Sequence, residues 1–288
     1  MKIQNNIVSL RDTGKSMAGN TDITEKKYRK LVLQASLNGL SFCCLDTLNQ
    51  SVLCVKDIDF SKFPRAKKVE DYYWQAFVDN MELTRTYDEV AVIHDNNLNT
   101  FVPKALFDQD YLGSYLQYNT KVFETDFFDY DDLESYEMNN VYIPYVNINN
   151  YLIDQFGSFE YKHTATILAS QILGLSKNNE EKLVYVHFSK YKFEIIVVQN
   201  QKLILFNSFD YRTKEDFIYY LLFAAEQLNL NPENFKLYLL GDISEDSEYF
   251  KIAWKYVRNV SIVDVTETEN RSGLSKAESV KHFILLQG

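Results

Sequence analysis

The order of apolar and polar positions predicts the same set of structural elements twice along this chain. Residues 33–95 and 184–242 each contain three short strands, an amphipathic helix and a further strand. Solenoid units are shorter, roughly 20–50 residues, so the pattern indicates a duplicated domain with a cleft between two similar lobes. An offset of 151 positions aligns the apolar residues of the strands and four pairs of identical residues: Phe42 with Phe193, Asn49 with Asn200, Gln50 with Gln201 and Asp59 with Asp210.

The elements of the first copy follow from alternation and from helical spacing. Tyr73, Phe77 and Met81 recur at helical spacing and form one apolar stripe. The Asn38-Gly39 pair is typical of a tight hairpin turn, because both residues adopt positive φ angles readily. We expect a helix over Val69–Glu82 and strands over Lys30–Gln34, Phe42–Thr47, Ser51–Val55 and Glu89–His94.

The middle of the chain has a less regular pattern. Two further helices have candidate N-caps: Asn147 or Asn149 for a helix that ends at Phe156, and Thr164 for one that ends at Leu173. The run 124–137 mixes acidic and aromatic side chains, as expected of an aromatic strand followed by a solvated loop, or of a surface that anchors a basic protein partner. Other expected elements are strands over Thr100–Pro103, Val122–Phe127 and Val141–Tyr145 and a short helix over Phe107–Leu116.

The second copy repeats the plan of the first and leads to three expected regions. Residues 1–29 are predicted to form an N-terminal arm, residues 30–175 the first lobe and residues 176–288 the second lobe. A polar stretch, Thr266–Ser275, precedes a final apolar segment. Expected strands are Leu183–Phe188, Lys192–Val198, Lys202–Asn207, Phe235–Leu240 and Val260–Val265, and expected helices are Glu215–Leu228 and Glu248–Val257.

Composition narrows the class of protein. With 288 residues, of which 46% are hydrophobic and 15% aromatic, the chain has material for two cores. Its formal net charge of −10 argues against binding to nucleic acid or to an anionic membrane surface. No apolar run approaches the roughly 20 residues that span a bilayer, and an odd count of three cysteines favours a reducing compartment. We therefore expect a cytoplasmic protein with no membrane span and no nucleic-acid partner.

Three antiparallel strands, a helix and a parallel strand, present twice, resemble the ribonuclease-H-like lobes of the actin, sugar-kinase and heat-shock-chaperone ATPase superfamily. Within it, the chain looks most like pilus and secretion assembly proteins of the PilM and GspL type. It also resembles a bacterial family common in Bacteroidetes, domain of unknown function 3822. The resemblance covers about residues 30–265. It implies an α/β (α+β) fold with two duplicated ribonuclease-H-like lobes, in the actin-like ATPase architecture with an interlobe cleft.

The resemblance also implies where a nucleotide would bind, and the residues there depart from the pattern. In the superfamily, the first hairpin of each lobe carries an acid and small residues, which organise hydrated Mg²⁺ and receive phosphates. The first hairpin here keeps Asn38, Gly39 and Ser41 as candidate phosphate contacts, but it has no acid. The second hairpin offers Ser189 and has neither the acid nor the glycine.

Further candidate positions follow the last strand of each copy. The superfamily's adenosine-contacting Gly-Gly turn resembles the segment in which Gly241 is kept, Asp242 replaces the second glycine and Ser244 follows. If a nucleotide binds weakly, Gly241→Ala should abolish binding without unfolding the protein, provided that Gly241 does not need a positive φ. Asp95 directly follows His94 at the carboxyl end of a predicted parallel strand, where open α/β sheets place ligands.

Other constellations have simpler explanations. Thr13–Ser16 ends like a phosphate-binding loop, but Ser9 stands where that motif requires glycine, so a chance match in the arm is favoured. Within the same arm, Ile7–Leu10 is a candidate edge strand. The four histidines have no zinc-ligand spacing and are expected to be structural.

Two functions fit this pattern. The favoured one is a non-catalytic pseudo-ATPase that needs no cofactor and acts by binding an unidentified protein partner. Its basis is that phosphoryl transfer depends on positioning and charge stabilisation, whereas both hairpins lack the metal-organising acid. The alternative is an ATPase or kinase that binds ATP with Mg²⁺ in an atypical cleft, using Asn38, Gly39 and Ser41 near the phosphates and Asp95 or Asp242 as metal or ribose ligands.

Overall fold

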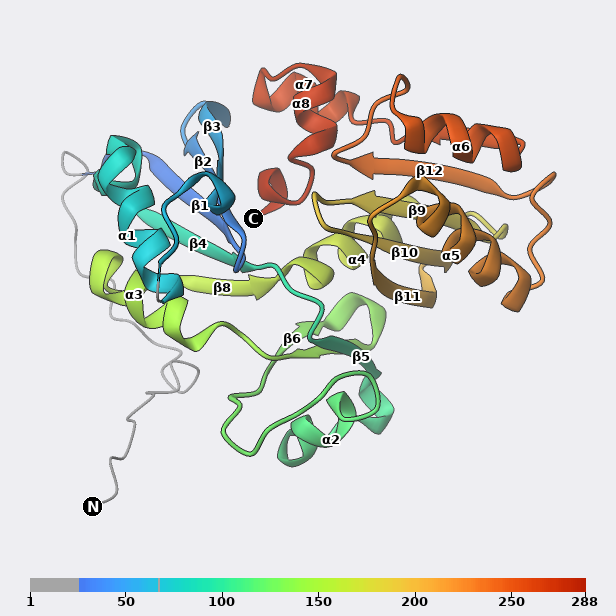
Figure 1. Ribbon diagram of the computed structural model, residues 1–288, viewed down its shortest axis with the longest axis horizontal. Helices are drawn as coiled ribbons and strands as arrows, with labels where there is room; N and C mark the ends of the chain where they lie inside the picture. Colours follow the sequence, from blue (N-terminus) through green and yellow to red (C-terminus); the bar gives the residue numbers. More distant parts are fainter. Residues whose placement is uncertain (1–25, 67) are drawn as a thin grey trace.

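The computed structural model describes residues 26–66 and 68–288, and their strands form three sheets (Figure 1). The first sheet has the order β3-β2-β1-β4-β8, with β1 antiparallel to β2 and parallel to β4. Helices α1 (Val69–Asp79) and α3 (Val146–Phe156) pack together over one face of this sheet and complete the first lobe. The strands are β1 (Arg29–Ala35), β2 (Gly39–Asp46), β3 (Ser51–Asp59), β4 (Glu89–His94) and β8 (Glu160–His163).

The second sheet repeats this arrangement. Its order, β11-β10-β9-β12-β13, has the same succession of antiparallel and parallel neighbours. Helices α5 (Lys214–Gln227) and α6 (Glu248–Tyr256) bury their apolar faces against it and complete the second lobe. The strands are β9 (Leu183–Phe188), β10 (Lys192–Gln199), β11 (Lys202–Asp210), β12 (Lys236–Gly241) and β13 (Asn259–Ile262).

A small third sheet lies between β4 and α3 in the chain. Its order is β5-β7-β6, and the short helix α2 packs on it. The rings of Phe101 and Phe206, 5.0 Å apart between centroids, join this sheet to β11 of the second lobe. Its elements are β5 (Asn99–Pro103), α2 (Leu112–Leu116), β6 (Asp129–Leu133) and β7 (Met138–Tyr142).

The largest apolar cluster joins the two lobes. Helix α4 (Thr164–Leu175) contributes Leu168 and Ile172, which are buried together with residues of both large sheets. After α7 (Thr266–Ser272) and α8 (Lys276–Lys281), the chain returns to the first sheet, where Lys30 Nζ donates to the Gly288 oxygen at 3.0 Å. Figure 1 shows α4 between the lobes and the C-terminus beside the first lobe. The boundary at residues 175 and 176 therefore stays a prediction.

In the structure, each residue of the first hairpin matches a residue of the second hairpin that lies two positions further along the chain than the 151-residue offset predicts. Gly39 pairs with the last residue of β3, and Lys192 pairs with the last residue of β11. Gly39 therefore corresponds to Lys192, and the predicted match of Phe42 with Phe193 is wrong by two residues. Because strand side chains alternate between faces, a two-residue slip preserves the apolar pattern.

Several predicted elements differ from the structure, mainly in the middle of the chain. The strand expected over Val122–Phe127 is wrong: the chain turns there, and Asp126 Oδ2 accepts a hydrogen bond from the Phe123 backbone N–H at 2.8 Å. Short polar side chains that bond to nearby backbone groups compete with a strand ladder in this way. The helix expected over Phe107–Leu116 is divided into a 3₁₀ turn, Gln109–Tyr111, and α2.

The N-caps and the polar segments were also predicted incorrectly. Helix α4 is capped by His163, whose Nδ1 accepts from Ala165 N at 3.1 Å, and not by Thr164. The cap of α3 is Tyr145 instead of either asparagine. The polar strand β8 was not anticipated, and neither was helix α7 in the polar stretch.

Two sequence predictions, Ile7–Leu10 as a strand and Thr13–Ser16 as a chance motif, lie outside the described residues. Among residues 26–66 and 68–288, every helix is too short or too polar to cross a bilayer.

Candidate functional site

A cleft of about 530 Å³ lies between the two lobes. Its walls come from the β1–β2 hairpin, the β9–β10 hairpin and the C-terminal segment, which contributes Lys281 and His282. Gly241 and Ser244 are not among its lining residues, so the structure brings together six of the eight predicted positions. These six are Asn38, Gly39, Ser41, Asp95, Ser189 and Asp242.

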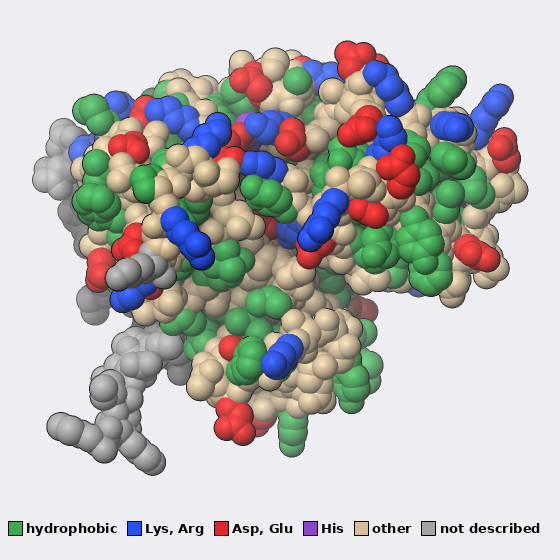
Figure 2. Space-filling view, in the orientation of Figure 1, with side chains coloured by type: hydrophobic (Ala, Val, Ile, Leu, Met, Phe, Trp, Pro, Cys, Tyr) green, Lys and Arg blue, Asp and Glu red, His purple; other side chains and the backbone are tan. Residues whose placement is uncertain are grey.

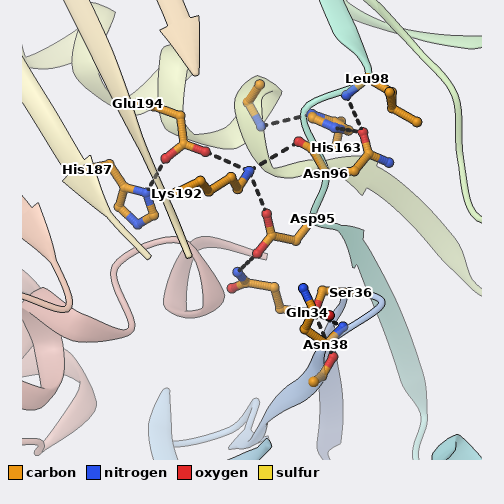
Figure 3. Close-up of polar contacts among 12 residues, drawn as sticks. Gln34, Ser36, Asn38, Asp95, Asn96, Leu98, His163, His187, Lys192 and Glu194 are labelled. Carbon is orange, nitrogen blue, oxygen red and sulfur yellow. Dashed lines mark hydrogen bonds and ion pairs between the residues drawn. The ribbon is translucent and has the colours of Figure 1, made fainter. Parts of the chain in front are cut away.

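Lys192 lies at the centre of the polar contacts that join the lobes (Figure 3). Its Nζ is 2.8 Å from Asp95 Oδ1, across the cleft, and 2.7 Å from Glu194 Oε1 on its own strand. It also donates to the backbone oxygen of Asn96 at 3.1 Å. The other carboxylate oxygen of Asp95 accepts from Gln34 Nε2 at 3.0 Å. One tethered ammonium therefore holds together carboxylates from both lobes.

The electrostatics of this group keep Lys192 and Glu194 charged. Burial alone would raise the pKa of Glu194, but the Lys192 charge and the hydrogen bond with His187 Nδ1, 2.9 Å away, hold that pKa at about 2. Burial alone would lower the pKa of Lys192, but Asp95 and Glu194 raise it above its ordinary value. An ammonium between two carboxylates is thus the stable state of the cleft centre.

A second pair of contacts also joins the walls of the cleft. Lys190, in the second hairpin, forms an ion pair with Asp59 at the end of β3. Lys281, at the end of α8, forms another with Asp57, which also accepts from Ser41 Oγ at 2.6 Å. The hydrogen bond from Lys190 lowers the pKa of Asp59 to about 2. In each of the three ion pairs described between the first lobe and the later part of the chain, the first lobe supplies the carboxylate and the later part supplies the lysine.

The β1–β2 and β9–β10 hairpins, which border the cleft, have the same backbone hydrogen bond at the turn. Ser36 N donates to Gly39 O at 3.1 Å in the first lobe, and Ser189 N donates to Lys192 O at 2.9 Å in the second. A tyrosine hydroxyl closes each turn, from Tyr73 to Ser36 O at 2.8 Å and from Tyr211 to Ser189 O at 3.0 Å. The lobes therefore share a turn, and Lys192 occupies the position of the glycine.

The glycine of the first hairpin is explained by packing. A Cβ added to Gly39 would lie 2.6 Å from the backbone oxygen of Ile58, so the close approach of β3 requires a residue without a side chain. Asn38 N donates to Ser36 Oγ at 3.2 Å, and Ser41 is engaged by Asp57. The phosphate-binding role suggested for these three residues stays untested.

Gly241 does need a positive φ, which corrects the expectation for its replacement by alanine. Its φ is +87°, and an added Cβ would lie 2.2 Å from Phe188 O. The next residue, Asp242, donates its backbone N–H to Phe188 O at 2.8 Å, as Asp95 does to Ala35 O at the same distance in the first lobe. Gly241→Ala should therefore disturb the fold, so it cannot serve as a specific test of nucleotide binding.

At the cleft centre, a metal ion would compete with Lys192 for the carboxylates. Within the residues that the structure describes, no three His, Cys, Asp or Glu side chains are grouped to hold a metal ion. The two central carboxylates, Asp95 and Glu194, already share the Lys192 ammonium. A metal would have to displace a covalently tethered cation, which cannot diffuse out of the cleft.

Sequence reasoning missed the charged residues that dominate this site: Asp57, Asp59, Lys190, Lys192, Glu194 and Lys281. The sequence held a local signal for some of them. Asp57 and Asp59 are two residues apart at the end of a strand, so their side chains lie on the same face. Lys190 and Lys192 likewise flank one position of a hairpin. Nothing local identified their partners, because each pair joins residues from distant parts of the chain.

Two repeated sheets around a central cleft define a two-lobed protein with the actin-like ATPase fold, here with lysine–carboxylate pairs across the cleft. A model of the family described as "Protein of unknown function (DUF3822)" matches residues 18–260, and the chain belongs to that family.

Solved structures agree on the fold. A Bacteroides thetaiotaomicron protein with an actin-like ATPase fold and unknown function has a TM-score of 0.73 and 22% identity, over 88% of this chain and 99% of that one. The PilM–PilN type IV pilus biogenesis complex contains a chain with a TM-score of 0.56 and 10% identity, over 89% of this chain and 96% of that one. The cytoplasmic domain of EpsL, from the Vibrio cholerae type II secretion system, has a TM-score of 0.47 and 13% identity, over 86% and 96%.

No curated protein matches the sequence. The predicted family and the predicted fold class are confirmed by the family match and by the first two structures.

Proposed function

We propose that this protein is a non-catalytic, cytoplasmic member of the actin-like class, a pseudo-ATPase that acts by binding other proteins. The observation that carries the proposal is the Lys192 ammonium, which lies between Asp95 and Glu194 where the two lobes meet. Phosphoryl transfer needs a metal ion and positioned phosphates at such a cleft. Here a side chain supplies the positive charge instead.

Exchanging this ammonium for a metal would be costly. Breaking a buried ion pair by removing one partner typically costs about 3–5 kcal/mol, because the remaining charge stays buried without compensation. Mg²⁺ is also reluctant to lose its water ligands and requires near-octahedral oxygen donors. The cleft with Lys192 between its two carboxylates is therefore favoured over a nucleotide-bound one.

Exposed aromatic residues support a role in protein binding. On α5, Tyr219 and Phe223 are 62% and 50% exposed, and their rings stack with centroids 6.2 Å apart. Trp254 on α6 is 68% exposed. Figure 2 shows hydrophobic side chains gathered over this part of the second lobe. Aromatic side chains of this kind anchor many interfaces. In addition, PilM, a chain of similar fold, is found in a complex with PilN.

A titration with ATP and Mg²⁺ tests the pseudo-ATPase part. Ligand at 100 times its Kd would stabilise the protein by about 2.7 kcal/mol, so a thermal-shift assay at millimolar nucleotide should show no change. The ATPase alternative would be supported by Mg²⁺-dependent turnover that follows a single purified species. That turnover should be lost on Asp95→Asn or Asp242→Asn.

Affinity capture from the native cell tests the protein-binding part. The tagged protein and a control with Trp74→Ser and Val78→Ser, exposed residues of α1, should retain the same partner. A variant with Tyr219→Ser and Phe223→Ser should lose it. Equal capture by both variants would contradict an interface on α5, and reproducible absence of any partner would contradict the binding role itself.

A further inference from the structure

Two cysteines face each other across the outer strands of the first sheet. Cys44 in β2 is the direct antiparallel partner of Cys54 in β3. Both pack against the apolar cluster beneath α1 and α3, whereas Cys43 points to the opposite face. Directly opposed residues have Cβ atoms about 4.5–5.5 Å apart. A disulfide needs about 3.5–4.5 Å between the same atoms, so a small approach of the two strands would bring the sulfurs within bonding distance.

The backbone next to this pair can make that approach. The β2–β3 register shifts between Cys44 and Leu45, which leaves Leu53 without a cross-strand partner and 51% exposed. Such a bulge bends a strand locally and increases its twist. Strand β3 is also the last strand of its sheet, so it is held by one neighbouring strand only. Movement of β3 toward β2 would therefore break no backbone hydrogen bonds to another strand.

The surroundings give the two thiols different reactivity. Cys54 is half-buried, and the hydrogen bond from Cys44 lowers its pKa to about 7. Cys44 is buried, and its pKa is raised by its hydrogen bond with Cys54 and by burial. The Tyr87 hydroxyl, 3.0 Å from Cys44 Sγ, helps to hold that side chain in place. The more accessible sulfur is thus the one with more thiolate character, which is the form that reacts with oxidants.

We propose that Cys44 and Cys54 form a redox-sensitive pair that closes to a cross-strand disulfide when a peroxide reaches β3. The Cys54 thiolate attacks one peroxide oxygen and the O–O bond breaks, giving a sulfenic acid on Cys54 and a hydroxide ion from hydrogen peroxide. The Cys44 sulfur then attacks the Cys54 sulfur. The S–S bond forms, and the sulfenic hydroxyl leaves as water with the Cys44 proton. Two thiols are oxidised and one peroxide is reduced.

The bond would fix a part of the fold that carries the cleft. Strand β3 ends with Asp57 and Asp59, the partners of Lys281 and Lys190. A covalent link between β2 and β3 prevents β3 from separating from its neighbour, so these two carboxylates stay in register with Gly39 and Ser41. Backbone amides of β3 should then exchange with deuterium more slowly in the oxidised protein than in the reduced one.

The test uses the folded full chain and hydrogen peroxide. Limited oxidation, alkylation and peptide mapping should yield one linked peptide pair, Cys44 with Cys54, and a monomer that has lost two hydrogen masses. Thiol titration should fall from three groups to one, since the chain has three cysteines. Cys43→Ser is the matched control, because it changes a neighbouring cysteine on the opposite face and should leave the bridge intact.

Two variants separate the steps of the reaction. Cys44→Ser should leave a Cys54 sulfenic acid that dimedone traps, and Cys54→Ser should abolish both bridge and adduct. Should Cys44→Ser fail to fold, mapping of the unmodified protein and of Cys54→Ser still decides the question. A bridge that includes Cys43, a disulfide formed only between molecules, or two remaining free thiols, Cys43 and Cys44, beside a Cys54 adduct would each overturn the proposal.

Discussion

The hairpin of the first lobe and that of the second have the same backbone but carry different side chains at the cleft. Both turns have the same serine-to-backbone bond and the same tyrosine contact. At the corresponding position, Gly39 leaves space for the Ile58 oxygen, whereas Lys192 places an ammonium between two carboxylates. The comparison shows that the turn is maintained by its backbone, while the side chain at one position changes the charge placed in the cleft.

The strands next to these hairpins show a second exchange. Strand β4 ends in His94, which is fully buried opposite Ala35, and β12 ends in Gly241, opposite the bulky Phe188. In each lobe a large side chain faces a small residue. The large residue is on β4 in the first lobe, whereas in the second lobe it is on β9, the strand that corresponds to β1. The two lobes therefore satisfy the same packing with different residues, which sequence identity alone does not reveal.

The largest expected effect comes from Lys192→Met. The change leaves the buried Glu194 and the half-buried Asp95 without the Lys192 cation, so the free energy of unfolding should fall by about 3–5 kcal/mol in a urea titration. Adding Asp95→Asn and Glu194→Gln to the same variant removes the unpaired charges and should restore much of the loss. If the single and the triple variant were equally unstable, Lys192 would act through packing instead of charge.

Gly241→Ala should have the next largest effect. A Cβ at this position would lie 2.2 Å from Phe188 O at a φ of +87°, so clash and backbone strain add to a cost of about 2–4 kcal/mol. Gly157→Ala is the matched control, since Gly157 has a φ of +80° with no atom within 4 Å of an added Cβ. It measures the strain without the clash. Equal costs for the two variants would show that the approach of Phe188 contributes nothing.

The sequence predicted what depends on local pattern and missed what depends on distant contacts. Alternation and helical spacing located β4 at its observed bounds and identified the repeated order of elements. The same alternation concealed the two-residue slip that matches Gly39 to Lys192, because either register buries the same face. Asp95 was found from its place after a parallel strand. Its partner Lys192 was not, because that ion pair exists only once both lobes are assembled.

The pH dependence of stability should separate the cleft centre from the buried histidines. Burial lowers the pKa of His94 to about 4, so the unfolded chain binds a proton there first and stability falls as the pH drops from about 6.5 towards 4. For Glu194 the folded pKa of about 2 lies below the unfolded value, so its contribution is complete above about pH 4.5 and is lost towards pH 2.

Urea titrations across both pH ranges provide the measurement. Lys192→Met should flatten the lower range, between about pH 4.5 and 2, because the Lys192 charge counteracts burial and keeps the pKa of Glu194 below its unfolded value. An unchanged slope in the lower range would mean that Lys192 does not set the protonation of Glu194.

Lys190→Met should have the smallest effect, although Lys190 lies only two positions before Lys192 and also contacts a carboxylate of the first lobe. The side chain of Lys190 is 53% exposed against 12% for Lys192, so water and salt screen its interaction with Asp59. We expect no measurable change in the free energy of unfolding at physiological salt and a small loss at low salt. Pairing the variant with Asp59→Asn in a double-mutant cycle isolates the interaction. A coupling energy as large as that between Lys192 and Asp95 would show that contact across the cleft, and not burial, determines how strongly the lobes are held together.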